Sequence, residues 1–552
     1  MNWCERLRLI GHVLRWRFTW SRRDLDFKPQ GVVSPKFITA REAAALIPDG
    51  ACVFSSGIAG NARCSVFFYA IRERFQECGH PHGLTWMNGG AQGSRGKVPG
   101  TVEELGLPGL VRRYIAGHLE TVKAELNMAE EGLIELHTLP QGVISLLLEE
   151  QAQGRDSLVT KVGVGSFLDP RVGRGSAVSP GASNAFVQVE GAELRYTLPK
   201  VEYALFNAPY ADAEGNIYFK HAATITEDVQ SLKAAHANGG KVLVTVSKII
   251  PKDDASVSLR AAKVDYVVVH PWNEQTTSVL QSRYWPMFTP EADVDVREAV
   301  QQLKFINTLL KITPVRGKMG DVMAKLATDL FVEVVPKGAM VNIGVGFPEE
   351  VARMLVARRL EGDILFTTEA GAYGGLPAPG IFFGAAIKPL HLETSSIMFR
   401  RYATDLDAAV LGFLQVDSLG NVNVSKRGPY THDYVGPGGF PDIVSGARIL
   451  IFIGNWMANA EFAVQRGSVH LRKPGTPKFV AQVDEITLSG QEALRQGKTI
   501  FFVTNVGVFK LTERGLELIR VVPGIDIAQD ILAHSGARIL LPEDGVVPPA
   551  PI

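Results

Sequence analysis

A single carboxylate, Glu369, stands where an apolar run ends and a glycine-rich loop begins. The apolar residues 364–366 predict a short buried strand, and two threonines separate them from Glu369. Open α/β sheets place their ligand crevice at the carboxyl ends of strands, so this carboxylate is a candidate general base, metal ligand or covalent nucleophile. An exposed glutamate before an ordinary loop is the alternative. The glycines that would let backbone amides approach a ligand here are Gly371, Gly374, Gly375 and Gly380.

A second glycine cluster, in residues 436–440, offers a partner for this carboxylate. Its backbone N–H groups could form an oxyanion hole, which stabilises a carbonyl oxygen as that oxygen gains negative charge. A plain turn is the alternative. The presence of both loops in one chain favours the functional interpretation. The candidate residues of the second loop are Gly436, Gly438, Gly439 and Phe440.

Other catalytic and binding signatures are absent from the sequence. We find no phosphate loop of the Gly-x-x-x-x-Gly-Lys-Ser/Thr type, no His-Glu-x-x-His zinc motif and no Gly-x-Ser-x-Gly elbow. Residues 342–346 resemble the start of a dinucleotide fingerprint but lack its third glycine. His80 and His82 flank a proline in a polar turn, where histidines are more often solvated than bound to a metal. The sequence therefore predicts neither a metal site nor bound NAD.

Strands and helices must alternate to position these residues. Residues 339–343 predict a strand, residues 348–360 a helix and residues 364–368 a second strand. A strand, a helix and a strand within about thirty residues form a βαβ unit with parallel pairing. Further elements are predicted as strands over residues 241–246, 448–454, 478–483 and 499–504, and as helices over residues 227–238 and 525–535.

A repeat divides the chain into two halves. Residues 47–53 and 335–341 share a Pro-x-Gly-Ala turn followed by an apolar run. Residues 212–217 and 417–422 share an Asp-x-x-Gly-Asn core, which suits a tight turn. The first half is longer between its two motifs, so it must carry a large insertion, over most of residues 80–200. We therefore predict an α/β protein with two related open α/β domains and an extended insertion in the first.

The predicted organisation accounts for all 552 residues. A chain of this length exceeds the usual size of one domain. The Pro-rich end of the chain is expected to be frayed. The predicted parts are a basic N-terminal extension (1–34), an N-terminal domain (35–285), a helical connector (286–330), a C-terminal domain with Glu369 (331–540) and a tail (541–552).

Composition limits the partners and the compartment. The chain has 57 Lys and Arg residues against 57 Asp and Glu residues, so overall charge does not favour a nucleic-acid partner. Its four cysteines form no Cys-x-x-Cys pair, as is typical of a protein in a reducing compartment. No apolar run approaches the roughly 20 residues that span a bilayer. We therefore expect a cytoplasmic protein.

The first 23 residues hold six arginines and three tryptophans. A basic, aromatic amphipathic helix could lie on an anionic membrane surface. The alternative is an extension that packs on the body of the protein or on a second subunit. We favour the alternative, because the segment is short and its arginines are few.

Taken together, these segments resemble the family I CoA-transferases, and are most similar to the single-chain acetate/propionate type in which two related halves are fused. The resemblance covers residues 35–540 and includes several motifs in the same order. The matched segments are Glu-x-Gly at 369–371, Gly-Gly-x-Pro-Ala-x-Gly-x-x-Phe-Gly at 374–384, Gly-x-Gly-Gly-Phe at 436–440, Asn-x-Gly-x-Gly-x-Pro at 342–348, and further stretches at 139–142 and 422–426.

The resemblance implies a chemistry and its residues. Glu369 would attack the thioester carbonyl of an acyl-CoA, and the released CoA thiolate would then form a glutamyl-CoA thioester that an acceptor carboxylate resolves. The Gly439 amide and the Asn342 side chain would lie near the developing oxyanions, and Gln141 would come from the first half. CoA esters of short or medium-chain acids would be substrates, with no cofactor, and the protein would be a homo-oligomer.

Some positions depart from the family pattern. The usual Thr-Glu-Arg before a Val-Phe pair is replaced by a segment that contains Asn505 and Val506. Where the family usually has Arg-Gly before the first Asp-x-x-Gly-Asn turn, this chain has Asn207-Ala208. Arg63 and Cys64 stand where a proline is usual. These departures bear on substrate choice and on CoA contacts, and none of them removes Glu369.

Several alternatives stay open at the level of sequence. An acyl-CoA hydrolase on the same scaffold would use water in place of the acceptor acid. A non-catalytic protein could bind CoA esters without turning them over. The bulky Tyr373, Phe382 and Phe383 near the glycine loop could shape an acyl pocket or fill the core.

Overall fold

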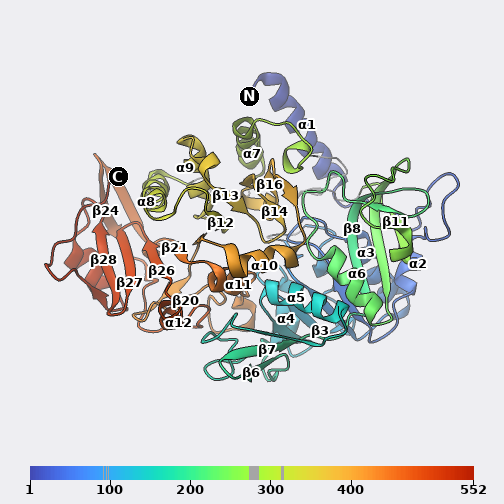
Figure 1. Cartoon of the computed structure of the whole chain (residues 1–552), viewed down its shortest axis with the longest axis horizontal. Helices are drawn as coiled ribbons and strands as arrows, with labels where there is room; N and C mark the ends of the chain where they lie inside the picture. Colours follow the sequence, from blue (N-terminus) through green and yellow to red (C-terminus); the bar gives the residue numbers. More distant parts are fainter. Residues whose placement is uncertain (91, 95, 97, 273–284, 312–315, 552) are drawn as a thin grey trace.

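Two mainly parallel sheets, one in each half of the chain, form the frame of the protein (Figure 1). The computed structural model describes residues 1–90, 92–94, 96, 98–272, 285–311 and 316–551. Parts of the predicted first domain and connector, residues 273–284 and 312–315, therefore lie outside the described residues. In Figure 1 the first half, in blue to green, lies at the right and below, and the second half, in yellow to red, lies at the centre and left.

The first sheet has the strand order β11-β10-β8-β1-β2-β3-β4, and each neighbouring pair is parallel. Short apolar runs form these strands, and β1 and β2 are buried along their whole length. Such continuous burial is typical of a parallel sheet that is covered on both faces. The strands are β1 (Cys52–Ser55), β2 (Leu84–Asn88), β3 (Val111–Ala116), β4 (Glu135–Thr138), β8 (Tyr203–Ala211), β10 (Lys241–Ile249) and β11 (Tyr266–Val269).

The second sheet repeats the central order of the first. The parallel strands β13-β12-β18-β21-β26 correspond to β2-β1-β8-β10-β11. Antiparallel pairs extend both edges, and β29 then pairs parallel with β28 at the outer end. This shared order confirms two related open α/β domains. The strands are β12 (Met340–Ile343), β13 (Leu365–Thr367), β14 (Ala372–Tyr373), β17 (His391–Leu392), β18 (Ala408–Leu411), β21 (Ile449–Ile453), β26 (Thr499–Val503), β27 (Gly507–Thr512), β28 (Gly515–Val521) and β29 (Ile539–Leu540).

The predicted insertion in the first half lies between β2 and β8. It adds β3 and β4 to the sheet, and it also forms a small antiparallel sheet in the order β5-β7-β6. The second half has no counterpart to this small sheet among its described residues. The strands of the small sheet are β5 (Ser157–Thr160), β6 (Val187–Glu190) and β7 (Glu193–Thr197).

Helices cover the sheets and form the contact between the halves. Helix α10 of the second half packs against α5 of the first half and against α11, at the centre of Figure 1. The helices are α2 (Ala40–Ala45), α3 (Ser65–Cys78), α4 (Lys123–Glu130), α5 (Gln141–Ala152), α6 (Asp228–Ala237), α9 (Glu349–Ala357), α10 (Ser395–Asp405), α11 (Phe440–Gly446) and α12 (Gly490–Arg495).

Of three further helices, two lie outside the sheet domains and the third packs on α9, β21 and β26 of the second half. Helix α1 (Trp3–Thr19) packs on α7 (Val296–Leu310), and α8 (Lys318–Val334) crosses the boundary predicted between residues 330 and 331. In the part of the chain that the structure describes, no helix has both the length and the apolar character needed to cross a bilayer. Remaining short strands are β9 (Ile217–Tyr218), β15 (Leu376–Pro377), β16 (Ala386–Ile387), β19 (Gln415–Val416), β20 (Val422–Asn423), β22 (Met457–Ala458), β23 (Glu461–Gln465), β24 (Ser468–Lys473) and β25 (Thr476–Pro477).

Two predictions of local structure are wrong, and a third is confirmed only in part. Residues 478–483 form one bridge to Val416 rather than a strand, because the neighbouring β19 is only two residues long. Residues 525–535 are helical but irregular: Asp526 caps a π turn over Ile527–Ile531 by accepting the Gln529 N–H, and a 3₁₀ turn follows over Leu532–His534. The tail is docked rather than frayed: Ala550 is 3% exposed and its N–H donates to the Val521 carbonyl at 2.7 Å.

Candidate active site

Glu369 lies in the tight turn between β13 and β14. The N–H of Gly371 donates to the Thr368 carbonyl at 3.0 Å, so the chain reverses directly after the carboxylate. Gly371 has φ +104°, and a Cβ atom added to it would lie 1.9 Å from the carbonyl oxygen of Glu393. Only glycine fits both the backbone conformation and this close approach. The turn therefore holds Glu369 at the carboxyl edge of the sheet, as the sequence predicts.

Asn342, on the neighbouring strand β12, is the side chain that meets this carboxylate. Its Nδ2 lies 3.5 Å from Glu369 Oε2 and donates to the Tyr402 hydroxyl at 3.1 Å. The Glu369 side chain is 8% exposed. Burial raises the pKa of Glu369 above its ordinary value, and the Asn342 amide opposes part of that shift. Burial and the nearby Glu369 charge also raise the pKa of Tyr402, which remains a neutral hydroxyl.

A narrow cavity of about 10 Å³, room for about one water molecule, opens onto Glu369. A second carboxylate, Glu349, also lines it. Glu349 accepts a hydrogen bond from the Gly380 N–H at 3.0 Å. Burial raises the pKa of Glu349, and the amides of Gly380 and Gly346 oppose the shift. Sequence reasoning missed Glu349, although its place in the first turn of a helix after a Gly-x-Gly segment marks it as a candidate.

The glycine loop after Glu369 forms one wall of this cavity. Thr368 Oγ1 donates to the Gly384 carbonyl at 2.8 Å, and Asn61 of the first half donates from Nδ2 to the Phe383 carbonyl at 2.6 Å. Phe383 lines the cavity, whereas Phe382 packs in the core with its ring 5.4 Å from that of Phe288. Of the two phenylalanines, only Phe383 can shape the space at Glu369. Gly374 and Gly375 lie between β14 and β15, away from the cavity lining.

The second glycine loop, residues 436–440, joins the two halves. The Gln141 N–H donates to the Gly438 carbonyl at 2.9 Å, and the Gly438 N–H donates to the Gly117 carbonyl at 2.8 Å. A Cβ atom added to Gly436 would lie 2.8 Å from the same Gly117 carbonyl oxygen, so this contact also requires glycine. Gln141 is 2% exposed, and among the described residues its Nε2 has no hydrogen-bond partner. A buried amide donor is thus available beside the loop.

The two predicted parts of the site are linked by aromatic rings rather than by direct hydrogen bonds. Gly439 caps α11 and packs beside Phe399, whose ring centroid lies 5.7 Å from that of Tyr402. Tyr402 in turn contacts Asn342. Within the described ranges, no hydrogen bond joins Glu369 to Gly439 or to Gln141. Phe440 faces the core, with its ring 6.0 Å from that of Phe452.

Buried acids at the contact between the halves were missed in the sequence. Asp442 accepts the Gly142 N–H at 2.9 Å, and burial raises the pKa of Asp442 to about 8. Glu227 accepts from Ser145 Oγ at 3.0 Å, and burial raises the pKa of Glu227 to about 7. A lone acid near a helix terminus is usually solvated, so no sequence signal marks these two as buried.

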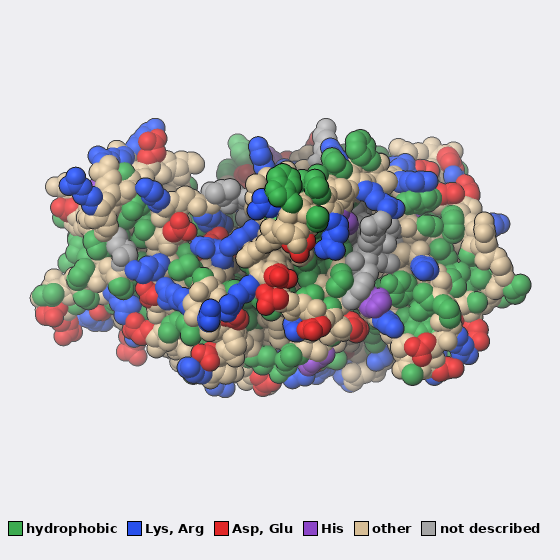
Figure 2. Space-filling model, turned by 90° about the horizontal axis from the view of Figure 1, so that it is seen from above, with side chains coloured by type: hydrophobic (Ala, Val, Ile, Leu, Met, Phe, Trp, Pro, Cys, Tyr) green, Lys and Arg blue, Asp and Glu red, His purple; other side chains and the backbone are tan. Residues whose placement is uncertain are grey.

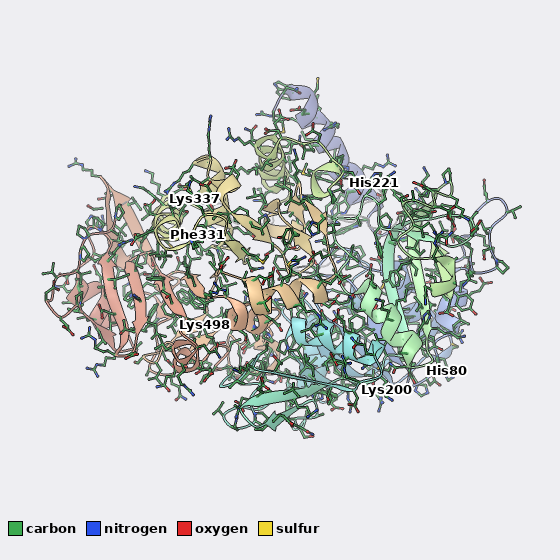
Figure 3. All side chains as sticks on the ribbon, in the orientation of Figure 1. His80, Lys200, His221, Phe331, Lys337 and Lys498 are labelled. Atoms are coloured by element: carbon green, nitrogen blue, oxygen red, sulfur yellow. The ribbon has the colours of Figure 1, made fainter. Side chains whose placement is uncertain are left out.

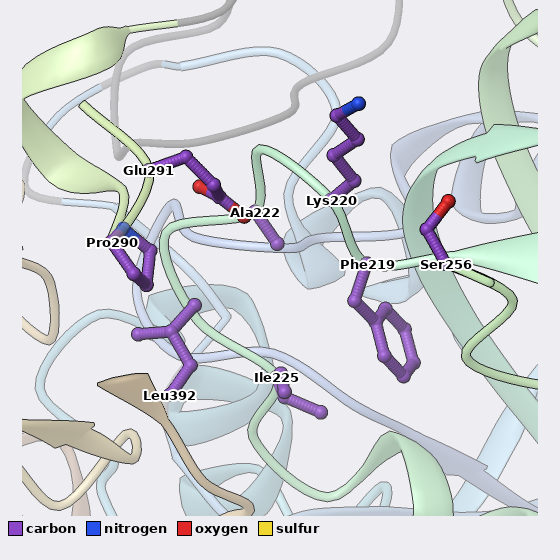
Figure 4. A pocket seen from close by; sticks show the side chains of 8 residues that line it. All are labelled: Phe219, Lys220, Ala222, Ile225, Ser256, Pro290, Glu291 and Leu392. Atoms are coloured by element: carbon purple, nitrogen blue, oxygen red, sulfur yellow. The ribbon is translucent and has the colours of Figure 1, made fainter. Parts of the chain in front are cut away.

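A larger cavity of about 390 Å³ lies between the halves but does not include Glu369 (Figure 4). Leu392 on its wall belongs to β17 and pairs with Ala372, three residues after Glu369. The cavity is therefore close to the Glu369 turn in the fold. Its lining residues are Phe219, Lys220, Ala222, Ile225 and Ser256 from the first half, and Pro290, Glu291 and Leu392.

The predicted His-Pro-His turn lies far from these loops in the fold. His80 Nδ1 is 2.9 Å and His82 Nε2 is 3.2 Å from Asp49 Oδ2, and all three residues are exposed. They stand before the amino ends of β1 and β2 in the first sheet, whereas Glu369 follows a strand of the second sheet. Figure 3 places His80 near the outer edge of the first half.

Known proteins resemble this chain over most of its length, although no family profile matches it. A caffeate CoA-transferase from Acetobacterium woodii is 34% identical over 513 residues, which cover 90% of this chain and 93% of that protein. The chain belongs to the CoA-transferases. The acetate CoA-transferase YdiF of Escherichia coli O157:H7 is 29% identical over 511 residues, 90% of this chain and 91% of that protein. The resemblance predicted from the motifs is therefore confirmed.

Solved structures show the same fold. The YdiF apoenzyme superposes with a TM-score of 0.77 at 26% identity, covering 95% of this CoA-transferase and 99% of YdiF. A thioester complex of YdiF with CoA superposes with a TM-score of 0.80 at 24% identity, covering 95% and 100%. The two related α/β domains predicted from the repeat are those of a CoA-transferase.

The departures from the family pattern occupy buried positions in this CoA-transferase. Asn505 Oδ1 accepts the Trp456 N–H at 2.8 Å, so this residue ties two loops at the strand ends. Asn207 is buried on β8, and Val506 is buried beside Asn505. Arg63 is buried directly before α3, and burial raises the pKa of the neighbouring Cys64 thiol. None of these residues lines the cavity at Glu369.

Proposed function

We propose that this CoA-transferase moves CoA from an acyl-CoA to a free carboxylic acid through a glutamyl-CoA thioester on Glu369. The observation that carries the proposal is the state of that carboxylate. It is buried, it lies in a cavity bordered by the glycine loop at residues 374–384 and by Gly344 after β12, and its one described side-chain donor, Asn342, is 3.5 Å away. A desolvated carboxylate with few hydrogen bonds is more nucleophilic than a solvated one. The CoA thioester complex of YdiF supports the same type of intermediate.

The proposed sequence conserves atoms and charge at each step. A Glu369 oxygen attacks the acyl thioester carbon, the carbon–sulfur bond breaks, and a mixed anhydride and the CoA thiolate form. The thiolate attacks the Glu369 carbonyl carbon of the anhydride, which releases the donor carboxylate and leaves the glutamyl-CoA thioester. An acceptor carboxylate repeats these steps in reverse order and leaves as its CoA ester. CoA esters serve as substrates throughout, and no cofactor enters the sequence.

Neighbouring groups have distinct roles in this proposal. The Asn342 amide stabilises negative charge on the Glu369 oxygen when the thiolate attacks the glutamyl carbon. The amide of Gly439, at the start of α11, acts on the acyl oxygen of the substrate. Gln141 offers its buried Nε2 to the substrate from the first half. Binding energy from the rest of the CoA molecule offsets the modest nucleophilicity of a carboxylate.

Substrate entry requires the cavity at Glu369 to widen, because about 10 Å³ cannot hold a thioester group. The wall that can move is the loop at residues 374–384. Two described side-chain hydrogen bonds, from Asn61 and Thr368, hold its end. The related enzymes are named for caffeate and acetate, so the acceptor panel should contain short-chain and aromatic acids.

The test is covalent trapping followed by peptide mapping. The enzyme is mixed with acetyl-CoA or another acyl-CoA and then treated with borohydride, which reduces a glutamyl thioester to an alcohol. We expect the mass change to map to the peptide that contains Glu369. Glu349 provides a matched control, because it lines the same cavity but already accepts the Gly380 N–H. Trapping should be lost in Glu369→Gln and retained in Glu349→Gln, and a label on Glu349 would refute the assignment.

Dependence on the acceptor acid separates transfer from hydrolysis. Transfer predicts that release of the donor acid stops after about one turnover per site when no acceptor is present. Hydrolysis predicts continued release of both acid and free CoA without an acceptor. Continued release at the full rate would therefore contradict the transferase assignment, even if Glu369 is labelled.

A further inference from the structure

Helix α1 has two apolar faces, and the body of the protein covers only one of them. Leu9 is 6% exposed and belongs to the core formed with α7. The His12 ring meets the Trp285 ring edge to face at 4.9 Å. These contacts hold the middle of α1 on the body, and the helix stands at the top of the molecule (Figure 1).

The other face carries a row of large apolar side chains in solvent. Trp3, Leu7, Leu14 and Phe18 are 73%, 57%, 52% and 84% exposed. At 100° per residue these four positions fall within about 60° of one another around the helix. We call this row the α1 stripe. Leu9 lies on nearly the opposite side of the helix, so seating α1 on α7 leaves the stripe uncovered.

Arginines flank the α1 stripe on both sides. On the same helical projection Arg8 and Arg15 lie on one side of it, and Arg6 and Arg17 lie on the other. All four are exposed, and Glu5 is the only acidic residue of the helix. Seen from above, the end at which α1 stands, the molecule shows hydrophobic side chains near the middle with Lys or Arg side chains beside them (Figure 2). The surface thus combines an apolar ridge with positive margins.

We propose that the α1 stripe docks this enzyme on a membrane surface that contains anionic lipid. The helix would lie parallel to the bilayer, with the stripe at the boundary between headgroups and acyl chains and the arginines at the lipid phosphates. Exposed aromatic residues at both ends of the stripe suit that boundary, where such side chains gather. The proposal does not depend on the covalent chemistry at Glu369.

Charge complementarity favours a lipid surface over a second copy of the chain. In a two-fold contact the stripe would face itself, and the arginines of the two copies would meet each other. Like charges brought together in an interface oppose association. Anionic headgroups instead supply the opposite charge along both margins of the stripe.

The test is flotation of the full-length enzyme with vesicles of phosphatidylcholine alone or mixed with phosphatidylglycerol. We expect at least about tenfold more protein on the anionic vesicles, and a marked loss of binding at 1 M salt. The double variant Leu7→Glu/Phe18→Glu should reduce binding to anionic vesicles at least about tenfold. Val32, which is 97% exposed and lies outside α1, provides the matched control Val32→Glu, expected to bind as the wild type does.

Two further measurements keep the proposal open to refutation. Transferase activity of the stripe variant in solution should equal that of the wild type, which shows that the fold is intact. Equal flotation of the wild type and the stripe variant, or no flotation of either, would overturn the proposal. A concentration-dependent dimer that the stripe substitutions abolish, without vesicle binding, would assign the surface to a second copy and equally overturn it.

Discussion

Replacing Asn342 with alanine removes the side-chain donor that lies on the Glu369 carboxylate. In the resting enzyme the Asn342 Nδ2 to Glu369 Oε2 distance is 3.5 Å, at the outer limit of a hydrogen bond. This contact therefore contributes little to the stability of the resting enzyme. When the CoA thiolate attacks the glutamyl carbon, that oxygen gains a full negative charge and the same contact strengthens. Loss of such a donor lowers kcat by roughly 10²–10³-fold.

The expected effect on stability is modest. The Tyr402 hydroxyl loses the Asn342 donor but keeps its hydrogen bond with Thr367, so no buried hydroxyl is left without a partner. The free energy of unfolding should fall by about 1–2 kcal/mol. A variant that folds with a slightly lower Tm and a kcat lowered at least about a hundredfold would match this reasoning.

Tyr402→Phe is the matched control for this variant. It removes the hydroxyl at 3.1 Å from Asn342 and leaves the amide free to reach Glu369. We expect less than about a tenfold loss of kcat, because the oxyanion donor remains. The assay is the single-turnover rate of glutamyl-CoA formation from acyl-CoA, with KM compared between variants. A kcat of Asn342→Ala within about threefold of the wild type would refute the proposed role of the amide.

Two further predictions concern pH. Burial raises the pKa of Glu369, so its charged form lowers the stability of the fold as pH rises above the ordinary carboxyl range. For the same reason, the fall of kcat/KM on the acid side of the pH profile should have its midpoint above pH 4.5. Glu369→Gln should therefore abolish transfer yet show a Tm advantage over the wild type that grows as pH rises above the ordinary carboxyl range. Asp442 should behave similarly, since its pKa is about 8 in the folded protein against 3.8 ordinarily. The stabilisation is complete at low pH and is lost as pH rises through that window, by at most about 1.4 kcal/mol per pH unit, and thermal melts of Asp442→Asn should lack this slope.

Apolar periodicity and turn residues were enough to predict the regular strands and the helix around β12 and β13. The strand, helix and strand expected over residues 339–368 are β12, α9 and β13, with ends shifted by one to three residues. Such local patterns are enough there, because the strands are buried on both faces. The strand predicted over residues 478–483 was wrong because its state depends on its partner, β19, which is only two residues long. The helix predicted over residues 525–535 is present, as a π turn followed by a 3₁₀ turn.

The sequence also could not separate side chains of one type by role. Phe382 and Phe383 are adjacent and chemically identical, yet one fills the core beside Phe288 and the other lines the cavity at Glu369. The sequence around Asp442 is that of an ordinary charged residue near a helix start, and the Gly-x-Gly segment before Glu349 marks a candidate position without showing that its carboxylate is buried. Only the surrounding atoms make them buried acids with raised pKa values.

The sequence alone determined the order of motifs, the duplication of the fold and the turn that presents Glu369. These features are local, since each depends on glycine, proline and apolar residues that are neighbours in the chain. Tertiary structure decided which groups meet: Asn342 with Glu369, Gln141 with Gly438 across the two halves, and Leu9 with the core while Leu7 faces solvent. Hydrogen-bond geometry and desolvation depend on atoms tens to hundreds of residues apart in the chain, and only folding brings those atoms together.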